Sequence, residues 1–126
     1  MKLLLDTQAM IWWFNDDPRL GPRARAAISD KGNAVWVSAA SFWEVSIKHR
    51  IGKLDECGSG LMDEALASGF CVVPIESGHL KALETFESVS GHNDPFDLII
   101  LIQARAIEAM LITSDRQMRK YDVRCL

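Results

Sequence analysis

The sequence predicts an α/β domain with a mainly parallel sheet and helices on both of its faces. Short apolar runs alternate along the chain with longer helical patterns, which is the order expected for strands connected by crossover helices. The chain has 126 residues, 48% of them hydrophobic, so it is long enough to bury one proper core. It contains no internal repeat and no linker, and we therefore expect residues 1–126 to form a single domain.

Each expected strand is a short apolar segment that ends at polar or turn-forming residues. The first ends at Asp6-Thr7, a natural junction from strand to helix, and the third is followed by Pro74. The expected strands are Lys2–Leu5, Ala34–Val37, Cys71–Val73, Leu111–Thr113 and Val123–Leu126. Because such folds bind ligands at the carboxyl ends of their strands, Asp6 and Asp115 lie where a site is expected.

The helices are predicted from their caps and their stop signals. Asp6 or Thr7 can cap the first helix, which stops near Pro18. Asp94 and Pro95 supply the cap and the first position of the most hydrophobic helix. The expected helices are one that follows Asp6, then Pro22–Ile28, Ala39–Ile51, Leu61–Ser68, Ser77–Phe86, Pro95–Ala109 and a short one that ends at Tyr121.

Composition and charge exclude several classes of protein. The net charge is −3, so no global basic field attracts nucleic acid, and local basic groups or a bound metal would have to do so. The three cysteines are an odd number without CxxC spacing, which argues against a disulfide framework or structural zinc. The longest apolar run, Leu98–Ile102, is far too short to span a membrane, and no signal peptide opens the chain. We therefore expect a soluble, cytoplasmic protein that has no membrane partner.

Four carboxylates stand where a strand passes into a helix or on a helix face expected to be buried, and Asp94 is a fifth candidate. The four are Asp6, Glu44, Asp97 and Asp115. Acids avoid such positions unless they are paired or bind a cation, and no lysine or arginine stands beside these four that must neutralise them. Acids gathered from distant parts of a small α/β domain indicate a divalent-metal site.

Structural explanations of the individual acids stay open at this level. Asp6 and Asp94 can be plain helix caps, and Asp97 gains from its place near a helix N-terminus. Glu44 can form an exposed i,i+4 ion pair with Lys48. Glu44 nevertheless interrupts an apolar stripe on its helix, which favours a functional role; the stripe is formed by Ala40, Ile47 and Ile51.

The donor types in this set favour a hard cation. Oxygen-only ligands suit Mg²⁺ or Mn²⁺, and the clustered His and Cys that zinc prefers are missing. Thr113 and Ser114, with Thr7, bring supporting hydroxyl groups next to two of the acids. The three histidines form no acid–base pair, and surface or capping roles are expected for them; His92 is worth following because it precedes Asp94.

Five short motifs in this order and spacing give the chain a resemblance to a known family. They are Leu-Leu-Leu-Asp-Thr at 3–7, Val-Ser-Ala-Ala-Ser-Phe-Trp-Glu at 37–44, Lys-His-Arg-Ile-Gly-Lys-Leu at 48–54, Asp-Pro-Phe-Asp at 94–97 and Thr-Ser-Asp at 113–115. Each motif is weak alone, but in this order and spacing they are highly specific, and the resemblance covers essentially all 126 residues. The sequence resembles a PIN-domain ribonuclease, specifically the VapC-type toxin of a bacterial toxin–antitoxin pair.

The resemblance implies a three-layer α/β/α PIN-like fold and an endoribonuclease that depends on Mg²⁺, with Mn²⁺ able to substitute. It assigns metal binding and catalysis to Asp6, Glu44, Asp97 and Asp115, with Asp94 as an extra acid of the Asp-Pro-Phe-Asp subgroup. RNA would be hydrolysed by a metal-activated water, leaving a 5′-phosphate and a 3′-hydroxyl. The family also implies a homodimer and a small antitoxin that blocks the site.

The chain departs from the subgroup at three positions near the motifs. Gln8 stands where histidine is frequent, and Asn93 and Leu98 stand where arginine is frequent. These departures affect expected substrate contacts rather than metal binding. The remaining candidates for weak RNA contacts are Lys48, Arg50, Lys53, Arg116, Arg119 and Lys120, which a solvated surface explains equally well.

Three other functions are weighed against the nuclease. A catalytically silent PIN-like module that binds RNA or protein would not need the complete set of acids. A phosphatase of the haloacid dehalogenase type needs a second aspartate two residues after the first, where Gln8 stands. A receiver-type phosphoacceptor needs an aspartate at the end of the third strand, where Pro74 stands.

Overall fold

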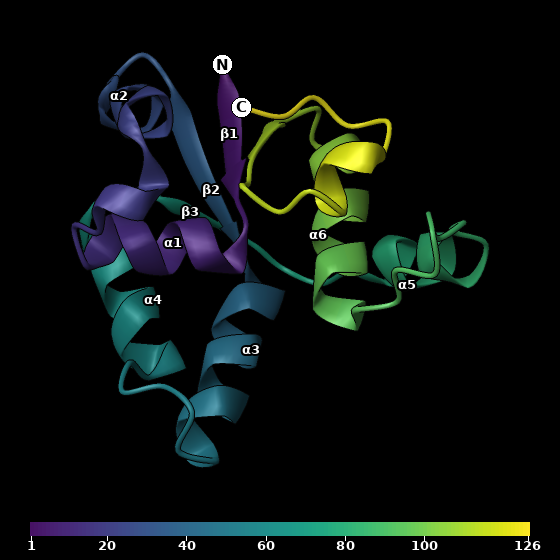
Figure 1. Ribbon diagram of the computed structural model, residues 1–126, viewed down its shortest axis with the longest axis horizontal. Helices are drawn as coiled ribbons and strands as arrows, with labels where there is room; N and C mark the ends of the chain where they lie inside the picture. The colour runs from purple at the N-terminus through teal and green to yellow at the C-terminus, as the bar shows by residue number, and fades with distance from the viewer.

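A computed structural model describes all residues 1–126, and it confirms the predicted alternation of strands and helices (Figure 1). The strands are β1 (Lys2–Leu5), β2 (Ala34–Ser38), β3 (Cys71–Val73) and β4 (Met110–Ile112). The α-helices are α1 (Thr7–Phe14), α2 (Pro22–Ser29), α3 (Ala39–Arg50), α4 (Gly58–Ala67), α5 (Ser77–Glu84) and α6 (Pro95–Ala106). Two short 3₁₀ helices complete the chain, η1 (Pro18–Leu20) and η2 (Met118–Lys120).

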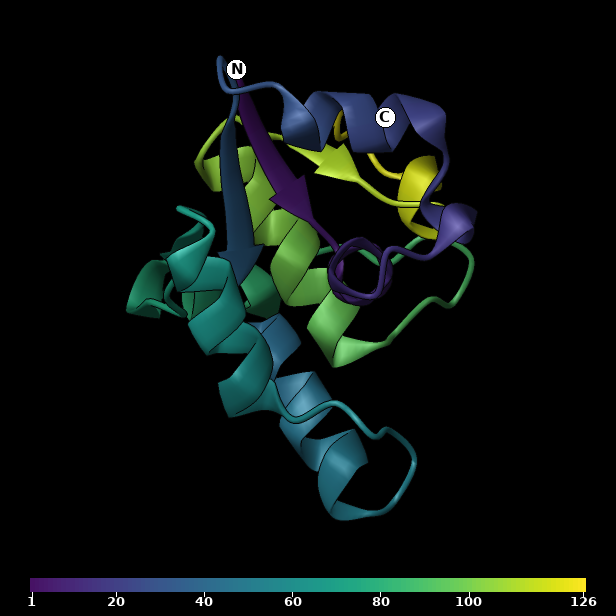
Figure 2. The same ribbon diagram turned by 90° about the vertical axis from the view of Figure 1, so that its left-hand side faces the viewer.

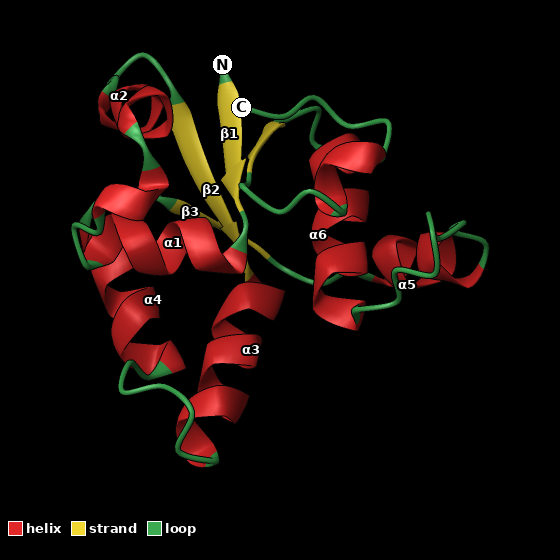
Figure 3. Ribbon diagram, viewed as in Figure 1, coloured by secondary structure: helices red, strands yellow, loops and turns green.

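The four strands form one parallel sheet in the order β3-β2-β1-β4. β1 lies inside the sheet, with Leu4 opposite Trp36 of β2 and Leu111 of β4. All strands therefore end at the same edge, where Figure 3 shows the chain passing into α1 and α3. This edge brings the residues after β1 and after β4 together, as the sequence predicts.

Helices cover both faces of the sheet, which gives the three-layer α/β/α arrangement. Leu3 and Leu5 point into a core that is shared with α1, α2 and α4, whereas Leu4 points into a second core shared with α6. Figures 1 and 2 show α1, α2 and α4 on one side of the sheet and α5 and α6 on the other. The alternation of β1 side chains between two cores explains why this strand is apolar at every position after Lys2.

Three predicted elements differ from the structure by three residues or more. The predicted strand Val123–Leu126 is reduced to one parallel bridge between Cys125 and Leu111. α6 ends at Ala106 instead of Ala109, and Glu108 takes a left-handed backbone with φ of 54° that turns the chain toward β4. α4 begins at Gly58, three residues before the predicted start.

Gly58, the first residue of α4, lies directly against α3. A Cβ atom at this position would lie 2.3 Å from the carbonyl oxygen of Phe42, which no side chain can tolerate. Helices α3 and α4 are thereby held in close contact, with α3 extending beyond the sheet edge (Figure 2).

No helix of the protein combines the length and apolarity required to cross a membrane.

Candidate active site

All five candidate acids line one pocket at the carboxyl edge of the sheet. The pocket has a volume of about 380 Å³ and lies where β1 and β4 end, beside the N-terminal turns of α1 and α6 and one face of α3. We call it the acid pocket; its lining is Asp6, Thr7, Gln8, Ile11, Glu44, Lys48, Leu54, Asp94, Asp97, Ser114 and Asp115. Four separate segments of the chain thus contribute carboxylates to one hollow, with Lys48 as its single basic side chain.

Asp6 lies at the floor of this site and is only 5% exposed. Its Oδ1 caps α1 by accepting the Ala9 N–H at 2.7 Å, and its Oδ2 accepts the Thr113 hydroxyl at 2.5 Å. Burial raises the pKa of Asp6 to about 6, against the lowering effect of these hydrogen bonds. The charges of Asp97 and Asp115 raise the pKa further, which places the three acids within electrostatic reach of one another.

Asp97 occupies the first turn of α6, and Asp94 caps the same helix. Asp94 Oδ1 accepts the N–H groups of Phe96 and Asp97 at 3.0 and 3.1 Å. Partial burial raises the pKa of Asp97 to about 6, and the charges of Asp94 and Asp115 add to the shift. Asp94 therefore acts as a helix cap and also lies on the acid pocket, so the two explanations of this residue are compatible.

Glu44 is buried, as predicted, but its surroundings differ from the predicted ones. Ile47 and Ile51, on the same helix face, are exposed because α3 extends past the sheet; Ile51 is 58% exposed. Glu44 itself is 9% exposed because it lies against Thr7 of α1, whose hydroxyl donates to Oε1 at 2.8 Å. The Lys48 ammonium donates to Oε2 at 2.7 Å, so the expectation that no lysine neutralises any of the four acids is wrong for Glu44.

Asp115 is exposed at the mouth of the pocket, next to Ser114. Its N–H donates to the Thr113 hydroxyl oxygen at 3.0 Å, and its Oδ1 accepts the Gln117 N–H at 2.8 Å. The Thr113 hydroxyl therefore contacts two of the acids, since it also donates to Asp6. This hydroxyl holds the ends of β1 and β4 in a fixed relation.

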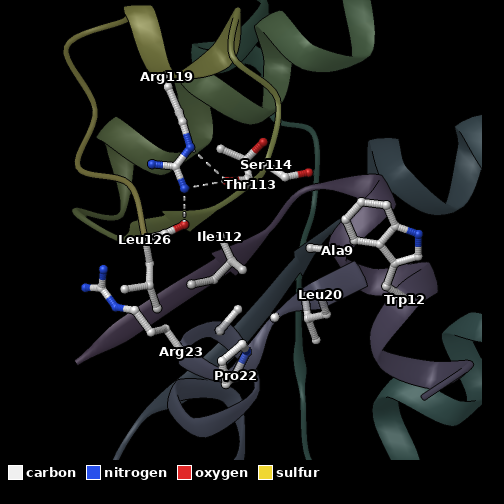
Figure 4. Close-up of a pocket in the computed structure, with 12 residues that line it drawn as sticks. Ala9, Trp12, Leu20, Pro22, Arg23, Ile112, Thr113, Ser114, Arg119 and Leu126 are labelled. Carbon is white, nitrogen blue, oxygen red and sulfur yellow. Dashed lines mark hydrogen bonds between the residues drawn. The ribbon is translucent and has the colours of Figure 1, made fainter. Parts of the chain in front are cut away.

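The six basic candidates are dispersed rather than gathered round the pocket. Lys48 lines the pocket, while Arg50 and Lys53 are exposed at the distal end of α3. Arg119 instead lines a second cavity and donates to the carbonyl oxygens of Thr113 and Leu126 (Figure 4). Arg116 and Lys120 are exposed near the C-terminus and do not line the acid pocket.

His92 is a neighbour of the site that the sequence indicates only weakly. His79 has the expected capping role at α5, and His49 is exposed, but His92 is 8% exposed and its Nε2 lies 2.9 Å from Asp97 Oδ2. Its Nδ1 lies 3.2 Å from the hydroxyl of Tyr121, a residue that no sequence pattern connected with the site. The only signal was the short distance along the chain between His92 and the Asp-Pro-Phe-Asp motif.

The donor set fits a hard divalent cation in chemical type. The pocket offers carboxylate oxygens and no cysteine. Burial is the main cause of the raised pKa values of Asp6 and Asp97, and neighbouring carboxylates add to both shifts. No three His, Cys, Asp or Glu side chains are arranged closely enough to form a ready-made metal site. A cation bound here would therefore draw carboxylates inward from their present hydrogen-bonded positions.

Comparison with known proteins identifies the family. The family model for the PIN domain matches residues 3–124. Similar solved structures include VapBC2 from Rickettsia felis bound to a fragment of its promoter DNA (TM-score 0.68, 16% identity, 100% of this chain and 98% of that one). VapBC-1 from nontypeable Haemophilus influenzae is also similar (TM-score 0.67, 20% identity, 100% of this chain and 97% of that one). So is a toxin–antitoxin complex from Klebsiella pneumoniae (TM-score 0.59, 21% identity, 98% of this chain and 95% of that one). At these identities the structures support the fold alone, and a comparison with curated proteins finds no significant match. Since the family model spans nearly the whole sequence, this chain belongs to the PIN domain family.

Proposed function

We propose that this protein is an endoribonuclease dependent on Mg²⁺ or Mn²⁺ and that it is the toxin of a toxin–antitoxin pair. The observation that carries the proposal is the acid pocket, in which five carboxylates from four segments line one hollow at the sheet edge. Membership of the PIN domain family supports the same conclusion. Neither a helix cap nor a surface ion pair explains why all five acids line the same hollow.

The proposed roles follow from the environment of each acid. Asp6, Asp97 and Asp115 affect one another electrostatically and would hold the cation, with Glu44 completing the set and Asp94 close by. A divalent cation bound there would activate a water and neutralise charge on the phosphate. Thr113 would keep Asp6 in place, because its hydroxyl donates to Oδ2. Thr7 does the same for Glu44.

Lys48 is the side chain of this pocket best placed to contact the RNA backbone. Its ammonium group is partly exposed and is held by Glu44 at 2.7 Å, so its position is restrained while donors remain for a phosphate. Such a contact binds phosphate without reading the base. We therefore propose that any sequence preference comes from other contacts.

A cognate antitoxin and a second copy of the chain are the proposed protein partners, and the cytoplasm is the proposed location. Three of the similar structures are described as VapBC or toxin–antitoxin complexes. Large apolar side chains are exposed on this protein, among them Trp43 and Ile51 of α3 at 57% and 58%. Tryptophan is enriched at protein interfaces, so Trp43 is the exposed side chain that best supports a protein partner.

Cleavage of a mixed RNA pool by the purified protein tests the proposed activity. We expect cutting in Mn²⁺, none in EDTA, and none by Asp6→Asn, with 5′-phosphate ends on the products. Asp63→Asn is the matched control, because Asp63 is an exposed acid of α4 that does not line the pocket. Cutting that persists in EDTA or in Asp6→Asn would contradict the proposal. A Mn²⁺-stabilised protein that cuts no RNA would favour the silent binding module.

A further inference from the structure

His92 and Tyr121 form a hydrogen-bonded chain that ends on Asp97. The chain begins at the Val89 N–H, which donates to the Tyr121 hydroxyl oxygen at 2.9 Å. The Tyr121 hydroxyl lies 3.2 Å from His92 Nδ1, and His92 Nε2 lies 2.9 Å from Asp97 Oδ2. The four groups come from the loop before α6, from α6 and from the residue after η2, so only the tertiary fold brings them together.

The direction of this hydrogen-bonded chain is set at its two ends. The Asp97 carboxylate can only accept, so His92 donates from Nε2 to Oδ2. The Val89 N–H can only donate, so the Tyr121 oxygen accepts from it. The Tyr121 hydroxyl then donates to His92 Nδ1 in the tautomer that carries its hydrogen on Nε2. Every polar atom of this chain is satisfied in this arrangement, as expected for a histidine that is 8% exposed.

The hydrogen-bonded chain restrains one carboxylate oxygen of Asp97 and leaves the other without a hydrogen bond. Oδ2 accepts from His92, whereas Oδ1 accepts no hydrogen bond from the protein. The imidazole is restrained in turn, since its ring packs against the Tyr121 ring at a centroid distance of 5.7 Å. We propose that His92 and Tyr121 are positioning residues that orient Asp97 so that its free oxygen faces the acid pocket for a divalent cation.

This inference rests on the proposed function, and it assigns His92 and Tyr121 a role in metal binding that acts through Asp97. Outer hydrogen bonds to metal-binding groups typically affect metal affinity by about 10- to 100-fold. Asp6 has an equivalent support in Thr113, and Glu44 has one in Thr7. Asp97 would be held by an imidazole instead of a hydroxyl, with the tyrosine fixing which imidazole nitrogen donates.

The test measures the Mn²⁺ dissociation constant by titration calorimetry, together with the melting temperature of the metal-free protein. We expect His92→Phe to weaken Mn²⁺ binding by about tenfold. Tyr121→Phe should weaken it less, because the imidazole remains. His92→Gln, whose amide can still donate to Asp97, should recover most of the affinity that His92→Phe loses.

Phe86→Leu is the matched control for a purely structural effect. Phe86 stacks on the Tyr121 ring at 5.5 Å but forms no hydrogen bond in the chain. This variant should lower the melting temperature and keep the wild-type Mn²⁺ affinity. If His92→Phe also lost only stability, the positioning role would be overturned.

Three further outcomes keep this inference distinct from the proposed function. Long-range ¹H–¹⁵N spectra of the metal-free protein should show the His92 proton on Nε2, and a proton on Nδ1 alone would overturn the hydrogen-bond chain. Wild-type protein that cuts RNA with Mn²⁺ while His92→Phe binds Mn²⁺ equally well would overturn this inference alone. Wild-type protein that neither binds Mn²⁺ nor cuts RNA would overturn the proposed function and this inference with it.

Discussion

Two cavities lie on either side of the end of β4, and they differ in the charges they hold. The acid pocket collects five carboxylates and one lysine. The second cavity, of about 320 Å³, is lined mostly by apolar atoms of residues such as Leu20 and Ile112, together with Arg23 and Arg119 (Figure 4). Ser114 borders both cavities.

Thr113 connects the two cavities and shows why their chemistry differs. Its hydroxyl donates to Asp6 on the acid side, whereas its carbonyl oxygen accepts both Nε and Nη2 of Arg119 at 3.1 and 2.8 Å. The Arg119 guanidinium is therefore hydrogen-bonded to the backbone, whereas the Asp6 carboxylate has no cation beside it. Charge that is already hydrogen-bonded to the backbone supports structure, and like charges gathered without a counter-ion indicate a site for one.

Asp97→Asn is expected to have the largest effect, since it breaks the acid pocket at its centre. Because Asp97 is proposed to hold the cation, its loss should lower the rate of Mn²⁺-dependent RNA cleavage by about 100-fold or more. The measurement is the initial cleavage rate at saturating Mn²⁺. Asparagine fits the first turn of α6, so the melting temperature should change little. A large drop in melting temperature would show that the rate is lost through misfolding instead.

The free energy of unfolding of the metal-free protein should depend on pH through Asp6. Its pKa rises from the ordinary 3.8 to about 6 on folding, so the folded state binds the proton more tightly. This contribution to stability is complete below pH 3.8 and is lost as the pH rises through about 6. Asp6→Asn removes the titration, so it should be more stable than wild type at pH 7 by about 1–3 kcal/mol.

The two proteins should be about equally stable near pH 3, roughly one unit below the ordinary pKa, where Asp6 is largely protonated in both states. Denaturant unfolding at about pH 3 and about pH 7 in EDTA measures this difference. A wild-type protein that is the more stable one at pH 7 without metal would contradict the raised pKa.

Arg119→Met tests the other side of the comparison and should affect stability only. The substitution removes hydrogen bonds to the carbonyl oxygens of Thr113 and Leu126, and a cost of about 1–2 kcal/mol is expected. The rate of RNA cleavage at 25 °C should stay unchanged, because the guanidinium does not line the acid pocket. A large drop in rate without loss of stability would show that Arg119 contacts substrate.

Lys48→Gln should have the smallest effect. Loss of one phosphate contact should raise the KM for RNA by roughly threefold to tenfold, with kcat little changed. The dependence of log KM on log salt concentration should become shallower by about 0.7. Lys31→Gln, an exposed lysine that does not line the acid pocket, is the control and should leave both quantities unchanged.

Much of the site was predictable because its acids follow local rules. Asp6 comes directly after β1 and Asp115 lies three residues after β4, and parallel strands end at one edge, so their proximity follows from the sequence pattern and the fold class. Asp94 and Asp97 are fixed by the cap and first turn of one helix. These positions depend on neighbours within a few residues, which sequence periodicity and capping preferences report directly.

Other features depended on contacts between distant segments, which no local pattern encodes. The periodicity of α3 predicted a buried stripe, yet only the sheet edge decides that Glu44 is covered and Ile51 is not. Position 58 requires glycine because the backbone of α3 lies against it.

By itself the sequence determined the alternation of strands and helices, the parallel sheet and the five acids, because these rest on period, capping and composition. The tertiary structure alone decided that Lys48 pairs with Glu44, that Arg119 is held by backbone carbonyls, and that His92 and Tyr121 support Asp97. The physical reason is that these contacts depend on how the chain packs in space rather than on the local sequence pattern. Hydrogen bonds between side chains form wherever packing brings the groups within about 3 Å, and that packing is set by the whole fold.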